Sequence, residues 1–217
     1  MYEKVLNNPK YLEVVNKIES MKFITNGKWD WDHGLGHYKR VAQYVKNILE
    51  QLNKDERTIE LGMTAALLHD IGLSDSGPNK IDHALKSSEM FRKYLVETDI
   101  TKEEEQILED AIKDHSNGNN IKSDIGMALV LADKLDVTYH RTINSSIQDD
   151  LNKEYQKIKK VDIEITDEFL IVKYKVEEEI NLDLLLEWNK MISIPKKIAK
   201  QLEKKYICMI NDKIIKI

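Results

Sequence analysis

The feature that most constrains the fold is a helical spacing of apolar residues, which persists through the first 157 residues of this 217-residue chain. Apolar positions recur at intervals of three and four, as on one face of an amphipathic helix. The segment 56–71 is especially apolar, so we expect it to be the most buried helix. The pattern predicts helices over residues 9–21, 37–52, 56–71, 80–96, 102–115 and 123–137. We therefore expect a mainly α protein built as a helical bundle.

The spacing changes after residue 157. Val161, Ile163 and Ile165 alternate with charged residues, and the run FLIVKYKV follows the turn TDE, which predicts a β-hairpin. The helical segments LDLLLEWNKM and PKKIAKQLEKKY come next, and Pro195 is expected at the start of the second helix. The final residues, ICMI-NDK-IIKI, predict another hairpin.

This change divides the chain into two predicted parts. Residues 1–157 are expected to form the helical domain, and residues 158–217 a small α+β appendage of antiparallel hairpins plus helices. We expect the appendage to pack on the helical domain, with a separate small domain as the alternative. A chain of this length is ample for a sizeable core.

Composition excludes several classes of protein. The net charge of −5 lacks the basic excess of general nucleic-acid-binding proteins, so nucleic acid is not an expected partner. Cys208 is the only cysteine, which excludes an internal disulfide and fits a reducing compartment. Charges interrupt the first 15 residues, unlike in a signal peptide, and no apolar run approaches the roughly 20 residues of a membrane span. We therefore expect a cytoplasmic protein that does not enter a membrane.

Histidine and aspartate fall at the ends of the predicted helices. All six histidines lie between residues 33 and 140. His69 and Asp70 end the helix 56–71, His115 ends another helix, and His83 follows a loop. Helices packed in a bundle can direct such residues to a common centre. Imidazole nitrogen and carboxylate oxygen together bind divalent metals without a thiolate, so the distribution favours a metal site.

Asp133 lies inside the apolar run ALVLADKLD. A carboxylate buried there is destabilising unless it is neutralised or coordinated. Pairing with Lys134 is the alternative, but adjacent residues on a helix do not face each other. Metal coordination is therefore our preferred interpretation of Asp133.

In order and in local context these residues resemble the H…HD…D signature of the HD-domain metal-dependent phosphohydrolases. His37 lies in HGLGHYKRV, the His69–Asp70 doublet in AALLHDIG, and Asp133 in LADKLD. The resemblance covers roughly residues 30–140 and implies an all-helical bundle with metal at its centre. The segment HSNGNN after His115 lacks the Gly-Tyr-Pro extension of the subfamily that hydrolyses cyclic di-GMP, so that substrate is not expected.

The resemblance also implies which residues bind metal. Many members add two histidines between the doublet and the last aspartate, and His83 and His115 occupy that interval. We therefore favour two divalent ions, whether manganese, iron, nickel, cobalt, zinc or magnesium, with Asp70 as the bridge. The alternative is a single ion, with His83 and His115 contacting the substrate. The implied ligands are His37, His69, Asp70, His83, His115 and Asp133.

The expected activity is hydrolysis of a nucleotide or another small phosphomonoester or phosphodiester by metal-activated water. The candidate catalytic residues are Asp70, His83, His115 and Lys86, and Lys86 lies one helical turn beyond His83. Further candidate cations are Lys80, Lys134 and Arg141.

Two other functions stay open at this point: a di-iron HD-type oxygenase that cleaves a polyol ring, and a non-catalytic ligand-sensing HD module. The sequence also leaves open the substrate, the metal and a homodimeric state. Asp136 either orients a ligand or lies at an exposed helix end. The roles of His33 and His140 are undecided, although His140 is expected outside the metal site.

Overall fold

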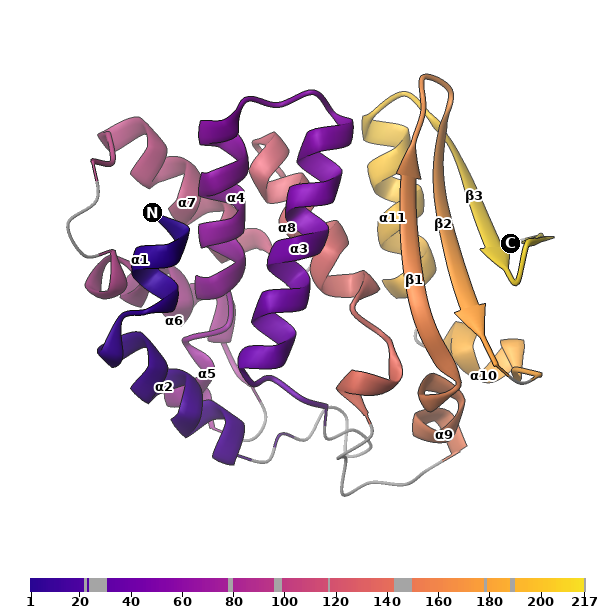
Figure 1. Ribbon diagram of the computed structural model, residues 1–217, viewed down its shortest axis with the longest axis horizontal. Coiled ribbons are helices and arrows are strands. Elements are labelled where there is room, and N and C mark those ends of the chain that lie inside the picture. The colour runs from indigo at the N-terminus through magenta and orange to yellow at the C-terminus, as the bar shows by residue number, and fades with distance from the viewer. Residues whose placement is uncertain are drawn as a thin grey trace.

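Figure 1 shows a helical bundle beside a small sheet in the computed structural model. The structure describes residues 1–21, 23, 31–77, 80–95, 99–116, 118–142, 150–177, 179–187 and 190–216. It confirms the predicted mainly α fold with a small α+β appendage. In the described part of the chain, no helix is both long and apolar enough to cross a membrane.

The centre of the bundle consists of α3 (Leu35–Gln51), α4 (Glu56–Leu68) and α8 (Asp124–Leu135). Gly62 lets α3 and α4 approach closely, because a Cβ there would lie 2.6 Å from Leu49 Cδ1. Further helices of the bundle are α1 (Tyr2–Leu6), α2 (Pro9–Ser20), α5 (Leu73–Ser76), α6 (His83–Met90), η1 (Phe91–Tyr94), α7 (Lys102–Asp114), η2 (Tyr139–Arg141) and α9 (Asp150–Gln156).

The most buried of these helices is α8, so the expectation for the segment 56–71 is wrong. Every residue of α8 from Ile125 to Leu135 is buried, whereas Ile59 and Met63 of α4 are only half-buried. The reason is the position of α8, which packs against α3, α4, α7 and the later helix α11 (Lys190–Gln201).

Side-chain caps fix where the helices that carry the histidines begin. The Asp55 carboxylate accepts a hydrogen bond from the Thr58 amide at the start of α4. Thr101 and Glu104 form a capping box at the start of α7. At their other ends, α4 and α7 stop immediately before His69 and His115, which therefore stand at the C-terminal ends of these helices.

The segment before α6 departs from the predicted helix 80–96. Lys80 and Asp82 have φ angles of +54° and +56°, in the left-handed region that residues other than glycine rarely adopt. The helix therefore begins at His83, and after Met90 it continues as the 3₁₀ helix η1. Val96, at the end of the predicted helix, lies outside the described residues.

The sheet has the strand order β1-β2-β3-β4. Its strands are β1 (Ile158–Ile165), β2 (Phe169–Val176), β3 (Lys205–Ile210) and β4 (Lys213–Ile215). The pairs β1–β2 and β3–β4 are antiparallel, which confirms both predicted hairpins. The pair β2–β3 is parallel, and the connection between them contains α10 (Leu182–Glu187) and α11. Trp188 and Asn189, inside the predicted helix LDLLLEWNKM, lie outside the described residues.

The helix α11 joins the sheet to the bundle, because it packs on α8 as well as on β2 and β3. It contains Pro195 in its interior, so the prediction of a helix starting there is wrong. Lys205 and Tyr206, expected at the end of that helix, belong to β3. One hydrophobic core runs from Val5 in α1 to Cys208 in β3. The proposed division of the chain at residue 157 stays a prediction.

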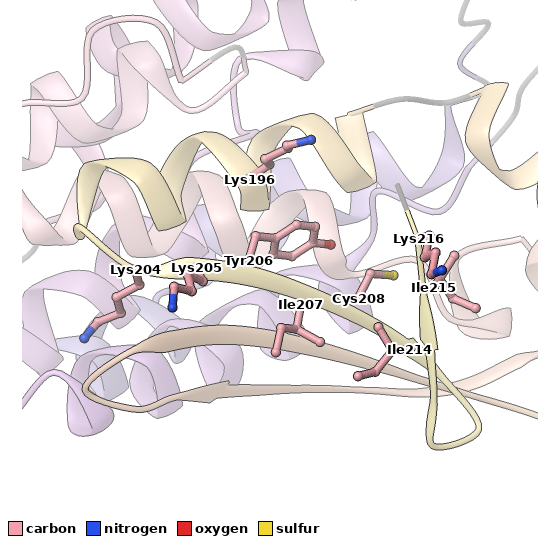
Figure 2. Close-up of a pocket in the computed structure, with 9 residues that line it drawn as sticks. All are labelled: Lys196, Lys204, Lys205, Tyr206, Ile207, Cys208, Ile214, Ile215 and Lys216. Atoms are coloured by element: carbon pink, nitrogen blue, oxygen red, sulfur yellow. The ribbon is translucent and has the colours of Figure 1, made fainter.

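A basic hollow lies on the side of the sheet that carries β4. Its volume is about 540 Å³, and Figure 2 shows Tyr206 beneath Lys196 of α11. The Lys204 ammonium donates to the carbonyls of Thr166 and Asp167, which closes one end of the β1–β2 hairpin. None of the residues that line the hollow is a histidine or carboxylate, so its chemistry differs from that of the predicted metal site.

Candidate metal centre

The structure brings all six predicted metal ligands to the centre of the bundle. Five of them are buried, and the side chain of His83 is 21% exposed. They come from separate helices: His37 from α3, His69 and Asp70 from the end of α4, His83 from the start of α6, His115 from the end of α7, and Asp133 from α8.

One set of ligand atoms surrounds His37 Nε2 and His69 Nε2, which lie 3.3 Å apart. Asp133 Oδ1 lies 3.4 Å from the first nitrogen and 3.7 Å from the second. Asp70 Oδ2 lies 3.8 Å and 3.3 Å from the same two atoms. Four ligands held tetrahedrally at about 2.1 Å from one ion would be about 3.4 Å apart. The donor set and its spacing therefore fit one divalent ion.

A second set of atoms gathers on the other oxygen of Asp70. Oδ1 lies 3.2 Å from His115 Nε2 and 3.5 Å from His83 Nε2. This oxygen is buried, yet it accepts no well-formed hydrogen bond from any residue that the structure describes. Buried carboxylate oxygens normally have a partner, so the site fits a cation between Asp70 and the two imidazoles.

The histidine tautomers also suit metal binding. Three of the rings donate their Nδ1–H to the carbonyl three residues earlier: His69 to Ala66 at 2.7 Å, His83 to Lys80 at 2.9 Å, and His115 to Ile112 at 2.6 Å. A carbonyl oxygen can only accept, so Nδ1 carries the proton. That leaves Nε2 of each ring directed at Asp70, as in metal sites where the outer nitrogen is held by a backbone oxygen.

His37 is oriented by Asp136 instead of by a carbonyl. Asp136 Oδ2 accepts the Nδ1–H of His37 at 2.7 Å, and Oδ1 accepts Nε–H of Arg40 at 2.8 Å. Asp136 is fully buried, and although burial opposes its charge, His37 and Arg141 hold its pKa well below the usual range. The structure therefore places Asp136 inside the protein, where it orients His37, and not at an exposed helix end.

The charges of the centre favour a bound cation. Although burial opposes the charge of Asp70, the charge of His69 and the hydrogen bond from His33 to Oδ2 hold its pKa well below its usual range. The two carboxylates, Asp70 and Asp133, overcome the burial of His69 and raise its pKa to about 10, so an ion bound at Nε2 would replace a proton there. Burial lowers the pKa of His115 to about 4, so this ring is neutral and able to bind metal at neutral pH.

Asp133 also contacts Lys134, contrary to the sequence argument that adjacent helix residues do not meet. The Lys134 ammonium forms an ion pair with Asp133 Oδ2. The long, flexible lysine side chain can reach around the helix, which a comparison of Cβ directions does not consider. The ion pair occupies only Oδ2 and leaves Oδ1 directed at His37 and His69, so it is compatible with metal binding by Oδ1.

The candidate cations differ in where they lie. The Lys80 ammonium lies 2.6 Å from His33 Nε2, and His33 Nδ1 lies 3.1 Å from Asp70 Oδ2. Arg141 Nη1 contacts both ring nitrogens of His37, with the closer approach to Nδ1 and a distance of 3.0 Å to Nε2. In contrast, Lys86 donates to the carbonyl of Asp75. Lys80 and Arg141 therefore line the centre, and Lys86 is held by the α5 segment.

Two further residues belong to this arrangement. Burial and the charge of Lys80 lower the pKa of His33 well below its usual range, so the neutral ring donates to Asp70 and accepts from Lys80. The Ser116 hydroxyl lies between His83 and His115, and nothing in the sequence around it distinguished this serine. His140 is exposed and stacks on Tyr139, in agreement with its expected position outside the centre.

Comparison with known proteins agrees with this geometry. The family model described as HD domain matches residues 34–204, which includes all six predicted ligands. No curated protein matches the chain. The match extends well beyond residues 30–140, where the sequence resemblance was seen, and reaches α11.

Proposed function

Because the chain belongs to the HD domain family, a superfamily of metal-dependent phosphohydrolases, we propose that it hydrolyses a nucleotide or another small phosphoester. One observation carries the proposal: the two oxygens of Asp70 face two separate sets of imidazole nitrogens. Such a carboxylate is suited to bridge two ions.

In the proposed site His37, His69, Asp133 and Asp70 would hold one ion, and His83, His115 and Asp70 would hold the other. Divalent ions bound there supply electrostatic stabilisation of phosphoryl oxygens and a water with a pKa near 7 in favourable cases. The protein's own task is to fix these ligands, and the outer hydrogen bonds of the four rings accomplish this.

Lys80 and Arg141 are proposed to bind the phosphoryl oxygens of the substrate. Among the residues that the structure describes, neither cation has a carboxylate of its own, because Lys80 contacts the neutral His33 and Arg141 shares Asp136 with Arg40. Burial and the nearby charge of Arg141 lower the pKa of Lys80 to about 8. Arg141 is buried and Lys80 is partly buried, so both cations lie where the phosphoryl oxygens of a bound substrate could pair with them.

Lys80→Ala tests this assignment. We expect the KM for an aryl phosphate to rise by roughly 10-fold at pH 7 and kcat to change less, because the lysine binds the substrate. In the wild type KM should also rise as the pH increases from 7 to 9, since Lys80 loses its charge through a pKa of about 8. The variant should lack that rise, and Lys80→Arg should keep a low KM across the range.

Lys86→Ala is the matched control for this experiment. It removes a lysine that donates to the Asp75 carbonyl, and its KM should stay close to that of the wild type. If KM rises in Lys86→Ala but not in Lys80→Ala, the substrate is bound by Lys86, as predicted from the sequence, and not by Lys80.

Metal dependence tests the proposed function as a whole. After chelation the protein should show no hydrolysis of a panel of nucleotides, aryl phosphates and phosphodiesters, and added manganese, nickel or cobalt should restore it. Metal analysis of the purified protein should find divalent ions bound. Bound iron with oxygen uptake on a polyol, and no phosphoester hydrolysis with any metal, would instead identify the oxygenase.

A further inference from the structure

Ser116 brings a hydroxyl group to the second set of ligand atoms. Its Oγ lies 3.1 Å from His83 Nε2 and 3.4 Å from His115 Nε2. Asp70 Oδ1 lies 3.5 Å and 3.2 Å from the same two nitrogens. Each of the two oxygens therefore lies near both nitrogens. The four oxygen–nitrogen distances are close to the approximately 3.4 Å expected between ligands of one ion.

We propose that Ser116 Oγ is a ligand of the second ion, and that this ion is bound more weakly and exchanges more readily than the first. The inference rests on the proposed function, because it takes Asp70 to bridge two ions. It adds a ligand that neither the sequence motif nor the family match singles out, and it ranks the two ions by affinity.

The difference in affinity follows from the charge of the two ligand sets. The first set has two carboxylates, Asp70 and Asp133, and the fully buried rings of His37 and His69. The second set shares only Oδ1 of Asp70, and Ser116 contributes a neutral oxygen. Affinity for divalent ions rises with the number of charged ligands and with the rigidity of the site, so the first ion should bind more tightly.

The second set is also more open. The side chain of His83 is 21% exposed, whereas those of His37 and His69 are completely buried. His83 is the first residue of α6 and follows the left-handed residues Lys80 and Asp82. A ligand in that position is reached by solvent more easily than one inside a buried helix, which favours exchange of the second ion.

The backbone of Ser116 is held in place by a contact with α11. It follows directly after His115 at the end of α7, and the Lys190 ammonium of α11 donates to its carbonyl at 3.3 Å. The backbone of Ser116 is therefore held by α7 and α11, which fixes the hydroxyl beside His83 and His115. The match to the HD domain extends to residue 204 and so includes α11, the helix that fixes this carbonyl.

The experiment is a titration of the metal-depleted full-length protein with Mn²⁺ alone, followed by electron paramagnetic resonance of free Mn²⁺ and by calorimetry. We expect the wild type to bind two ions with dissociation constants that differ by at least 10-fold. Ser116→Ala should keep the tight site unchanged and weaken the second site by a further 10-fold. Ser116→Thr, which retains a hydroxyl, should restore the second site.

Ser20→Ala is the matched control, since Ser20 also ends a helix and its hydroxyl donates to the carbonyl of Lys17. Its titration should equal that of the wild type, and circular dichroism should show that every variant is folded. If folded Ser116→Ala binds two Mn²⁺ ions with the same affinities as the wild type, Ser116 is not a ligand. The same conclusion follows if the wild type and Ser116→Ala each bind a single ion. If the wild type binds no Mn²⁺ or any other divalent ion, the proposed function itself is wrong.

Discussion

The Asp70→Ala variant is expected to lose its bound metal and at least about 1,000-fold of its phosphoester hydrolysis. The carboxylate contributes to both ligand sets, with Oδ2 at 3.3 Å from His69 Nε2 and Oδ1 at 3.2 Å from His115 Nε2. Asp133 cannot substitute for it, because its second oxygen is paired with Lys134. Elemental analysis of metal content and initial rates on an aryl phosphate and a diester measure the two losses.

Two further variants separate the loss of metal and activity from a loss of folding. Asp70→Asn keeps the shape of the side chain and one acceptor, so it should fold and still lose the bridging charge. Asp75→Ala removes a carboxylate five residues later whose side chain is 57% exposed and faces Lys17, and it should behave as the wild type. Full metal content and unchanged rates in folded Asp70→Ala would contradict the proposed function.

The residues that the structure brings together at the candidate metal centre are those that the resemblance to the HD-domain signature implied, and their role as ligands stays a prediction. A charged or polar residue inside an apolar helix, as at Asp133, or at the end of one, as at His69, is costly to bury unless it is hydrogen-bonded, paired or bound to a metal. Bundle packing then requires such residues to converge, and the structure brings them to distances of 3.2–3.8 Å. The residues of the site that are recognisable from their type and their place in a predicted helix could therefore be proposed from the sequence alone.

The parts that the sequence did not predict depend on contacts between distant segments. Ser116 became significant only through the positions of His83 and His115. Helical spacing favours Lys86, one turn beyond His83, but the structure directs Lys86 to the Asp75 carbonyl, and Lys80, which has a left-handed φ before the helix, lies 2.6 Å from His33 Nε2. Helical spacing carries no information about such a turn.

The parallel β2–β3 pair has a similar explanation. Each hairpin has a local turn signal, but a parallel pair depends on how the intervening helices return the chain. Pro195 seemed to start a helix, yet its φ also suits a helix interior, and burial against the core offsets the lost hydrogen bond. Tertiary packing, not local preference, determined both features.

Asp136→Asn is expected to weaken binding of the first ion by 10–100-fold and to lower kcat by a similar factor, as replacement of an orienting group usually does. The amide can no longer neutralise Arg40 and Arg141, so we also expect a loss of about 3 kcal/mol in the free energy of unfolding. For a chain of this size that corresponds to a fall in Tm of about 6–12 °C. Mn²⁺ titration and thermal unfolding measure the two effects separately.

The selectivity of the Mn²⁺ titration distinguishes positioning from general destabilisation. Asp136 accepts from His37, which belongs to the first ligand set alone, so the second site should keep its affinity in Asp136→Asn. Asp124→Asn is the control on the same helix, because it removes an exposed ion pair with Lys54 and should cost less than about 1 kcal/mol. If both sites weaken equally, or if only the stability falls, Asp136 does not act through His37 and its role is to neutralise Arg40 and Arg141.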